Sequence, residues 1–116
     1  MHEASLAAQI LDTAAFYAAE QRAARVSAIH LVVGDDAGCD AGSLELYFEM
    51  AAEGGLCAGA RLLTERVTPR LRCSACGRLF VRKPFSFACP EPGCPGEGEP
   101  TKIGREFYIK SIEVLL

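Results

Sequence analysis

The sequence CSACGRLFVRKPFSFACPEPGC occupies residues 73–94 and contains two short-spaced cysteine pairs, Cys73/Cys76 and Cys89/Cys94. Zinc takes four ligands in a tetrahedron, and thiolates suit it well. The gap between Cys73 and Cys76 lets one tight turn present both sulfurs to a single metal, and the wider second gap still suits structural zinc. Because four thiolates leave no position for water, the pattern predicts a structural, not a catalytic, zinc site in a ribbon-like module.

Two disulfides, four unligated thiols, or a redox pair formed by Cys73 and Cys76 are the alternatives to zinc. The choice depends on the redox compartment, because disulfides are rare in the cytosol. The sequence has no apolar run long enough to span a membrane, and Glu3 and Asp12 lie where a signal peptide would be apolar. We therefore expect a cytoplasmic protein without a membrane partner, in which closely spaced cysteines favour metal ligation.

The composition limits the size and class of the protein. The chain has 116 residues, 50% of them hydrophobic, and a formal net charge of −3. This length fits one domain, or one domain with a small appended module, and the hydrophobic content suffices for a modest core. Dedicated nucleic-acid binders usually carry a basic excess, so the slight acidic excess counts against that class.

The segments outside the cysteine module are predicted to form helices and strands. Residues 60–71 and 106–116 alternate in polarity like half-buried strands, and residues 26–33 have the aliphatic character of a buried strand. Residues 4–25 and 43–52 place apolar side chains at helical spacing. The predicted fold class is therefore α+β, with a small mixed sheet of about three strands and two helices.

The cysteine module interrupts this pattern, since it is rich in prolines and turn residues and shows little periodicity. We expect it to be a zinc-ribbon domain, residues 71–104, inserted into the α+β fold. Residues 1–70 and 105–116 are then expected to form a second domain from the two flanking parts of the chain.

The N-terminus offers a different set of metal donors. The Met1 amine, the His2 amide nitrogen and the His2 imidazole can form fused chelate rings, and a Glu3 amide or carboxylate can complete a plane. Square-planar sites rich in nitrogen suit Ni(II) and Cu(II). The alternative is that His2 is an ordinary residue at a frayed end and that Glu3 only interacts with the helix dipole.

The remaining histidine and cysteines are not predicted to bind metal. His30 lies within an apolar run and is interpreted as a core or edge histidine. Cys39 and Cys57 have no cysteine or histidine nearby in sequence, and free cysteine is commonly a small buried hydrophobe. The sequence shows no nucleophile–base pair and no open catalytic metal, so we expect a protein that is not an enzyme.

Several motifs together indicate a family. In order they are Met-His-Glu-x-Ser-Leu (Met1–Leu6), Val-Val-Gly (Val32–Gly34), the two cysteine pairs, and Gly-Arg-Glu-Phe-Tyr-Ile-Lys-Ser-Ile-Glu-Val (Gly104–Val114). This combination resembles the hydrogenase nickel-incorporation protein family, HypA/HybF, over essentially the full length of the chain. The Met-His-Glu opening with the late Ile-Glu-Val strand is specific to that resemblance.

The resemblance implies a nickel metallochaperone for [NiFe]-hydrogenase maturation. Such a protein works with a maturation GTPase and delivers nickel to the hydrogenase large-subunit precursor, and urease maturation proteins are a second destination in this family. By position, His2 and Glu3 match the family's nickel site, together with the backbone of Met1, His2 and Glu3. Asp40 follows the first strand, where some members place an acidic residue near the nickel.

The cysteine pairs match the family's zinc ligands with one departure. The resemblance assigns Cys73, Cys76, Cys89 and Cys94 to a structural zinc ion. The family's second pair is usually Cys-Pro-x-Cys, whereas Pro-Glu-Pro-Gly separates Cys89 from Cys94 here. The extra residues are expected to enlarge one knuckle without removing a ligand.

A zinc ribbon that binds nucleic acid is the rival hypothesis. A basic stretch without acidic residues runs through the module, with phenylalanines Phe80, Phe85 and Phe87 interleaved. Its cations are Arg66, Arg70, Arg72, Arg78, Arg82 and Lys83. Basic residues with aromatics can track phosphates and stack bases. The alternative is that the phenylalanines pack the ribbon and the charges form a solvated face or a docking surface for an acidic protein.

Overall fold

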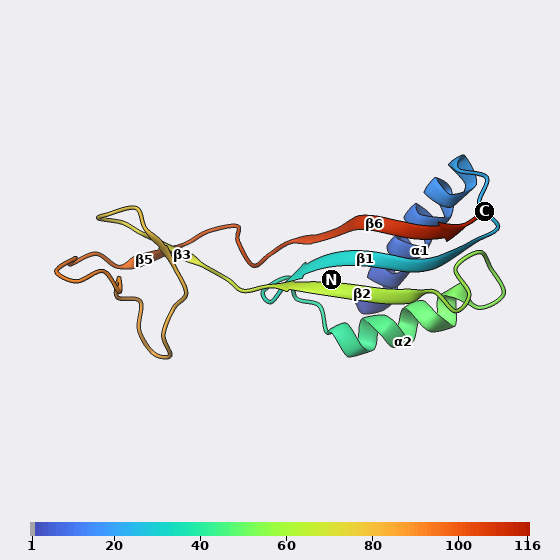
Figure 1. Ribbon diagram of the computed structural model, residues 1–116. Helices are drawn as coiled ribbons and strands as arrows, with labels where there is room; N and C mark the ends of the chain where they lie inside the picture. Colours follow the sequence, from blue (N-terminus) through green and yellow to red (C-terminus); the bar gives the residue numbers. More distant parts are fainter. Residues whose placement is uncertain (1) are drawn as a thin grey trace.

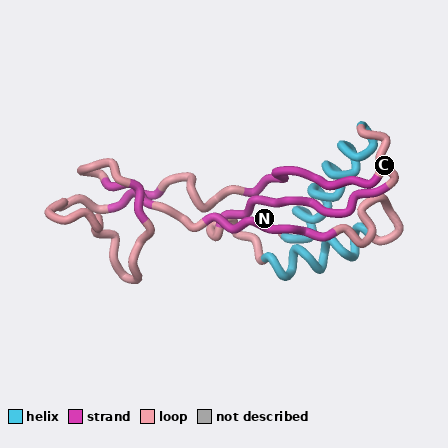
Figure 2. The backbone as a smooth tube through the Cα atoms, viewed as in Figure 1, coloured by secondary structure: helices cyan, strands magenta, loops and turns pink. Residues whose placement is uncertain are grey.

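A computed structural model describes residues 2–116 and has two small sheets at opposite ends of an elongated molecule (Figure 1). The molecule measures 58 × 25 × 16 Å along its principal axes. Both helices pack on the larger sheet, and the cysteine module extends away from it as a separate lobe (Figure 2). The predicted α+β fold, with two helices, a mixed three-stranded sheet and an inserted cysteine module, is confirmed.

The larger sheet has the strand order β2-β1-β6. The central strand β1 (Arg25–Gly34) pairs in parallel with β2 (Arg61–Val67) and antiparallel with β6 (Phe107–Leu115). Parallel neighbours need a crossover connection, and helix α2 (Ala41–Ala52) supplies it. Helix α1 (Glu3–Glu20) packs beside α2 on the same face of the sheet.

The main core lies between this sheet and the two helices. Burial of apolar side chains is the dominant favourable term in folding, and β1 supplies much of this core as the strand with neighbours on both sides. The buried residues of the main core are Leu6, Ala7, Ile10, Ala14, Ala18, Val26, Ile29, Leu31, Val33, Leu44, Phe48, Ala52 and Cys57. Neither helix is long and apolar enough to cross a membrane.

Helix α1 ends at Glu20, five residues before the end predicted near Arg25. Arg22 adopts a left-handed conformation with φ 54°, and the amide of Ala23 turns back to the carbonyl of Ala18. A left-handed residue cannot continue a helix, and such turns commonly satisfy the last carbonyls of one. The chain then enters β1 at Arg25. The apolar periodicity alone did not indicate that the helix ends before this residue.

The smaller sheet has the order β4-β3-β5. Strand β3 (Leu71–Cys73) lies between β4 (Leu79–Phe80) and β5 (Gly98–Pro100). The single strand predicted over residues 60–71 is divided, because β2 ends at Val67 and pairing resumes only at Leu71. The buried members of the second core are only Cys73, Phe80 and Cys89, too few to hold such a lobe by burial alone.

The two linkers between the sheets, residues 68–70 (first linker) and 101–106 (second linker), approach each other closely at the end of β1. A Cβ atom on Gly34 would overlap the carbonyl group of Gly104, so the backbones touch where both residues lack a side chain. The amide of Asp36 donates to the Gly104 oxygen at 2.7 Å, and the amide of Asp35 donates to the Val67 oxygen at 3.0 Å. These bonds tie the loop after β1 to both linkers.

Candidate metal centres

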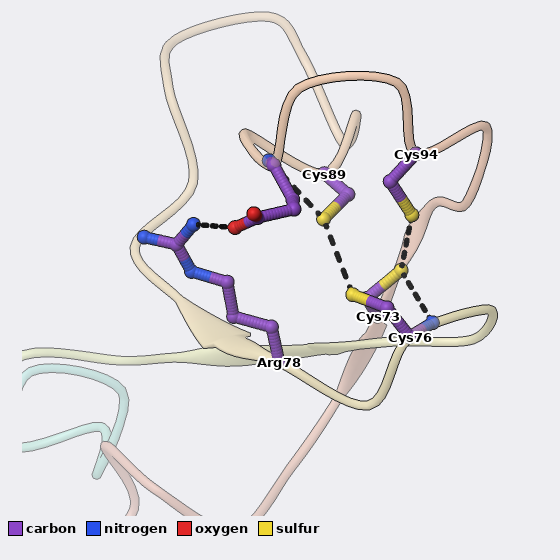
Figure 3. A network of polar contacts seen from close by, with 6 residues as sticks. Cys73, Cys76, Arg78, Cys89 and Cys94 are labelled. Atoms are coloured by element: carbon purple, nitrogen blue, oxygen red, sulfur yellow. Dashed lines mark hydrogen bonds and ion pairs between the residues drawn. The ribbon is translucent and has the colours of Figure 1, made fainter.

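The four predicted zinc ligands form one cluster in the smaller lobe. Their Sγ atoms all lie within 4.8 Å of one another. Cys73 ends β3 and Cys76 follows in the next turn, whereas Cys89 and Cys94 come from the second knuckle (Figure 3). The Sγ–Sγ distance is 3.6 Å between Cys73 and Cys94 and 3.7 Å between Cys76 and Cys89.

These distances fit a tetrahedral metal site. With a Zn–S bond of about 2.3 Å, the edge of the sulfur tetrahedron is about 3.8 Å, whereas sulfurs in a disulfide lie about 2.05 Å apart. All six cysteines of the chain are free. The donor set therefore suits a tetrahedral thiolate centre, and the alternative of two disulfides does not describe this structure.

The electrostatics of the cluster call for a cation. The amides of Cys76 and Ala75 donate to the Cys73 sulfur, which lowers the pKa of that thiol to about 6. The amide of Glu91 lowers the pKa of Cys89, but desolvation and the neighbouring thiols outweigh it and raise that pKa to about 12. Cys73 therefore ionises more readily than Cys89. A divalent cation bound at the centre would stabilise thiolates and so favour ionisation of its ligands.

The longer second knuckle keeps both of its cysteines in the cluster. Glu91, within the loop that separates Cys89 from Cys94, forms an ion pair with Arg78 from the turn after the first pair. Both side chains are about half exposed, so the pair contributes less than about 1 kcal/mol. The extra residues thus add a contact between the two knuckles and remove no thiol from the cluster.

The second group of predicted ligands lies where the N-terminus of α1 meets the N-terminus of α2. His2 is the N-cap of α1, and its Nδ1 accepts a hydrogen bond from the Ala4 amide at 3.3 Å. Glu3 Oε1 accepts from the Asp40 amide at 3.0 Å, although 37 positions separate the two residues. Asp40 is itself the N-cap of α2, where its Oδ2 accepts from the Ser43 amide at 2.9 Å. The structure thus brings Glu3 next to Asp40, one residue from His2; Met1 lies outside the described residues.

Hydrogen bonds favour the charged form of both acids at this end. The Asp40 amide, which bonds the Glu3 carboxylate, lowers the pKa of Glu3. Bonds from the Ser43 side chain and amide lower the pKa of Asp40. Two carboxylates that stay ionised next to an imidazole provide oxygen and nitrogen donors for a metal cation. Tyr47 is a further neighbour that no sequence motif indicated, and its ring centroid lies 6.1 Å from that of His2.

The residues not predicted to bind metal lie elsewhere. His30 is neither in the core nor on an edge strand, so that interpretation is wrong: it is partly exposed on the central strand, with Nε2 2.6 Å from Glu113 Oε2. Cys57 is fully buried in the main core, and Cys39 packs against that core. Desolvation raises the pKa of both thiols, in agreement with a structural role.

The fold and the four-thiolate cluster define a small α+β metal-binding protein with a zinc-ribbon lobe. The family model described as "Hydrogenase/urease nickel incorporation, metallochaperone, hypA" matches residues 1–114. The chain therefore belongs to the HypA family.

Individual relatives are similar in sequence to this chain over almost its full length. The hydrogenase maturation factor HypA of Caldanaerobacter subterraneus is 35% identical over 115 residues, covering 98% of this chain and 99% of the relative. That of Chlorobium limicola is 38% identical, covering 98% of this chain and 97% of the relative.

Solved structures share the fold. The solution structure of a HypA protein has a TM-score of 0.72 at 21% identity, covering 99% of this chain and 97% of that one. The solution structure of the Ni metallochaperone HypA from Helicobacter pylori has a TM-score of 0.64 at 21% identity, covering 99% and 98%.

We expect one zinc ion per chain, lost when one thiolate is removed. Cys76→Ser should bind zinc too weakly to retain it against EDTA, because the remaining thiolates leave one position to water. The second core is too small to hold the lobe alone, so NMR signals of β3 should lose dispersion while those of β1 persist. Cys39→Ser is the control and should keep its zinc. Equal zinc content in both variants would rule out the four-thiolate centre.

Proposed function

We propose that the chain is a nickel metallochaperone that delivers Ni(II) during [NiFe]-hydrogenase maturation. The observation that carries this proposal is the hydrogen bond between Glu3 and the Asp40 amide, which gathers the predicted nickel ligands at one end of the helices. The family description names nickel incorporation, and the curated relatives are hydrogenase maturation factors. Nickel is the cargo of the protein in this proposal, and zinc is its resident structural metal.

The proposed nickel donors are the Met1 amine, backbone nitrogens of the first residues, the His2 imidazole, and carboxylates of Glu3 and Asp40. His2 and Asp40 are exposed, and Glu3 is only partly covered. An exposed site lets an acceptor protein add its own ligands before the chaperone releases the ion. Delivery by ligand exchange needs no catalytic group, and we propose no enzymatic role for the chain.

We propose that zinc occupies the four-thiolate cluster and only maintains the lobe. Four protein thiolates close the coordination sphere, so no position is left for substrate or water. The functional division we propose is a nickel-binding domain, residues 1–70 and 105–116, and a zinc-ribbon domain, residues 71–104. The two separate hydrophobic clusters support this division.

The proposed partners are the proteins that take part in passing nickel from this chain to the enzyme. A maturation GTPase assists delivery, and the hydrogenase large-subunit precursor receives the ion. The family description also names urease, so urease maturation proteins are a second proposed destination.

A nickel titration with a matched pair of histidine variants tests the proposal. The chain has only two histidines, so His2→Ala and His30→Ala make the same change at different places. Untagged wild-type protein and His30→Ala should each bind one tight nickel, and His2→Ala should lose it, since the imidazole closes a chelate ring. Zinc should remain at one per chain in all three. Equal nickel binding by the two variants would refute the proposed site.

Nickel loading should also release the first turn of α1. Chelation with the His2 amide nitrogen uses imidazole Nδ1, the atom that accepts from the Ala4 amide. Losing an N-cap costs about 1 kcal/mol, so the Ala4 amide should exchange with solvent about fivefold faster in nickel-loaded protein. Amide exchange measured by NMR should show no change at Ile10, inside the helix. Unchanged protection of Ala4 with one nickel bound would exclude coordination through Nδ1.

A further inference from the structure

A cleft lined by three arginines lies where the two lobes join. It has a volume of about 360 Å³, and its lining residues come from the loop after β1, the two linkers and the zinc-ribbon lobe. Arg70, Arg82 and Arg105 line it, and they come from the first linker, the zinc lobe and the second linker. The hydroxyl of Thr101 donates to the Arg70 carbonyl at 2.6 Å, which ties the two linkers together inside the cleft.

The arginines outnumber the acidic residues in this cleft. All three arginines are exposed, and none belongs to the ion pairs formed among residues 2–116. Asp36 is the one acidic residue lining the cleft. Arginine presents a planar fork of donors that matches carboxylates in pairs, so three unpaired guanidiniums favour an anionic ligand with more than one carboxylate.

Apolar side chains line the cleft next to the arginines. They are Pro69, Phe87, Pro100 and Ile103. The guanidinium of Arg82 lies 4.9 Å from the centroid of the Phe87 ring, a cation–π contact. Apolar surface next to three cations accommodates an apolar side chain flanked by acidic ones.

We propose that this cleft binds an acidic segment of a partner protein, with an apolar side chain inserted between carboxylates. This interaction goes beyond nickel delivery and does not depend on nickel. Because the three arginines come from three different segments, a bound peptide would contact both linkers and the zinc lobe at once. The cleft is therefore a docking site at which a partner holds the lobes in one relative position.

Nucleic acid fits the same cleft less well. Affinity for nucleic acid grows with the number of phosphates that the protein neutralises. Three cations in a chain of net charge −3 would neutralise few phosphates, so the affinity would be low. Stacking of bases needs free aromatic faces, and Arg82 covers one face of Phe87, the one aromatic ring that lines the cleft. Of the other phenylalanines in the basic stretch, Phe80 is buried in the second core and Phe85, though fully exposed, does not line the cleft.

Peptide binding by the full-length, zinc-loaded chain tests the proposal. The probe is a blocked Glu-Glu-Phe-Glu-Glu peptide, titrated by NMR and calorimetry. We expect amide shifts at residues 70–71, 82–83, 85–87 and 101–105, and a Kd at least tenfold higher in the triple variant Arg70→Gln, Arg82→Gln, Arg105→Gln. The control triple variant Arg22→Gln, Arg25→Gln, Arg61→Gln removes the same charge from the larger domain and should leave the Kd unchanged.

Three results would overturn the proposal. One is the absence of binding by the wild-type chain. Another is an equal loss of affinity in both triple variants, which would mean that only net charge matters. The third is tighter binding of a single-stranded oligonucleotide at the same residues, which would assign the cleft to nucleic acid. Zinc content and NMR dispersion of each variant verify that it is folded.

Discussion

The backbone contact between Gly34 and Gly104 determines how the two lobes are joined. Both linkers to the zinc lobe pass the end of β1 there, and a side chain on Gly34 would overlap the Gly104 carbonyl. The hydrogen bonds of Asp35 and Asp36 hold the following loop to those linkers. That loop leads to Asp40, the N-cap of α2 that meets Glu3. The arginine-rich cleft is lined by residues of the same linkers, so this backbone contact helps to position both the cleft and the Asp40 end of α2.

The two proposed metal centres differ in the free energy needed to release their ion. The proposed zinc ligands include two of the three buried residues in the second core, so losing zinc would disrupt the lobe itself. The proposed nickel donors instead make hydrogen bonds at helix ends, each worth about 1 kcal/mol. When nickel leaves, these bonds can form again. We therefore expect the chain to retain zinc and to release nickel.

Selection of nickel cannot rest on affinity alone. Copper stands above nickel in the order of stability for nitrogen and oxygen ligands. The thiolate centre prefers softer ions and has a closed tetrahedral geometry, so it does not compete for the same coordination as the N-terminal donors. Copper scarcity and recognition by partner proteins must supply the remaining selectivity.

Local patterns in the sequence predicted the fold class and the cysteine cluster, because strand alternation and cysteine spacing are short-range signals. They did not predict the end of α1, which depends on a left-handed arginine at position 22 in place of the usual glycine. They also predicted one strand in place of β2 and β3. The break at residues 68–70 depends on the end of β1, the strand that pairs with β2, and local patterns do not contain that information. The contact between Glu3 and Asp40 arises from helix packing, so only the family resemblance pointed to both residues. Their role as nickel ligands stays a prediction.

X-ray absorption at the nickel and zinc edges of one sample tests whether the two metals occupy separate sites with different ligands. The sample is untagged protein that carries one nickel and one zinc per chain. We expect four sulfur neighbours at about 2.3 Å around zinc, and only nitrogen and oxygen around nickel. Sulfur in the nickel shell, or nitrogen and oxygen in place of sulfur around zinc, would contradict two separate centres with different ligands.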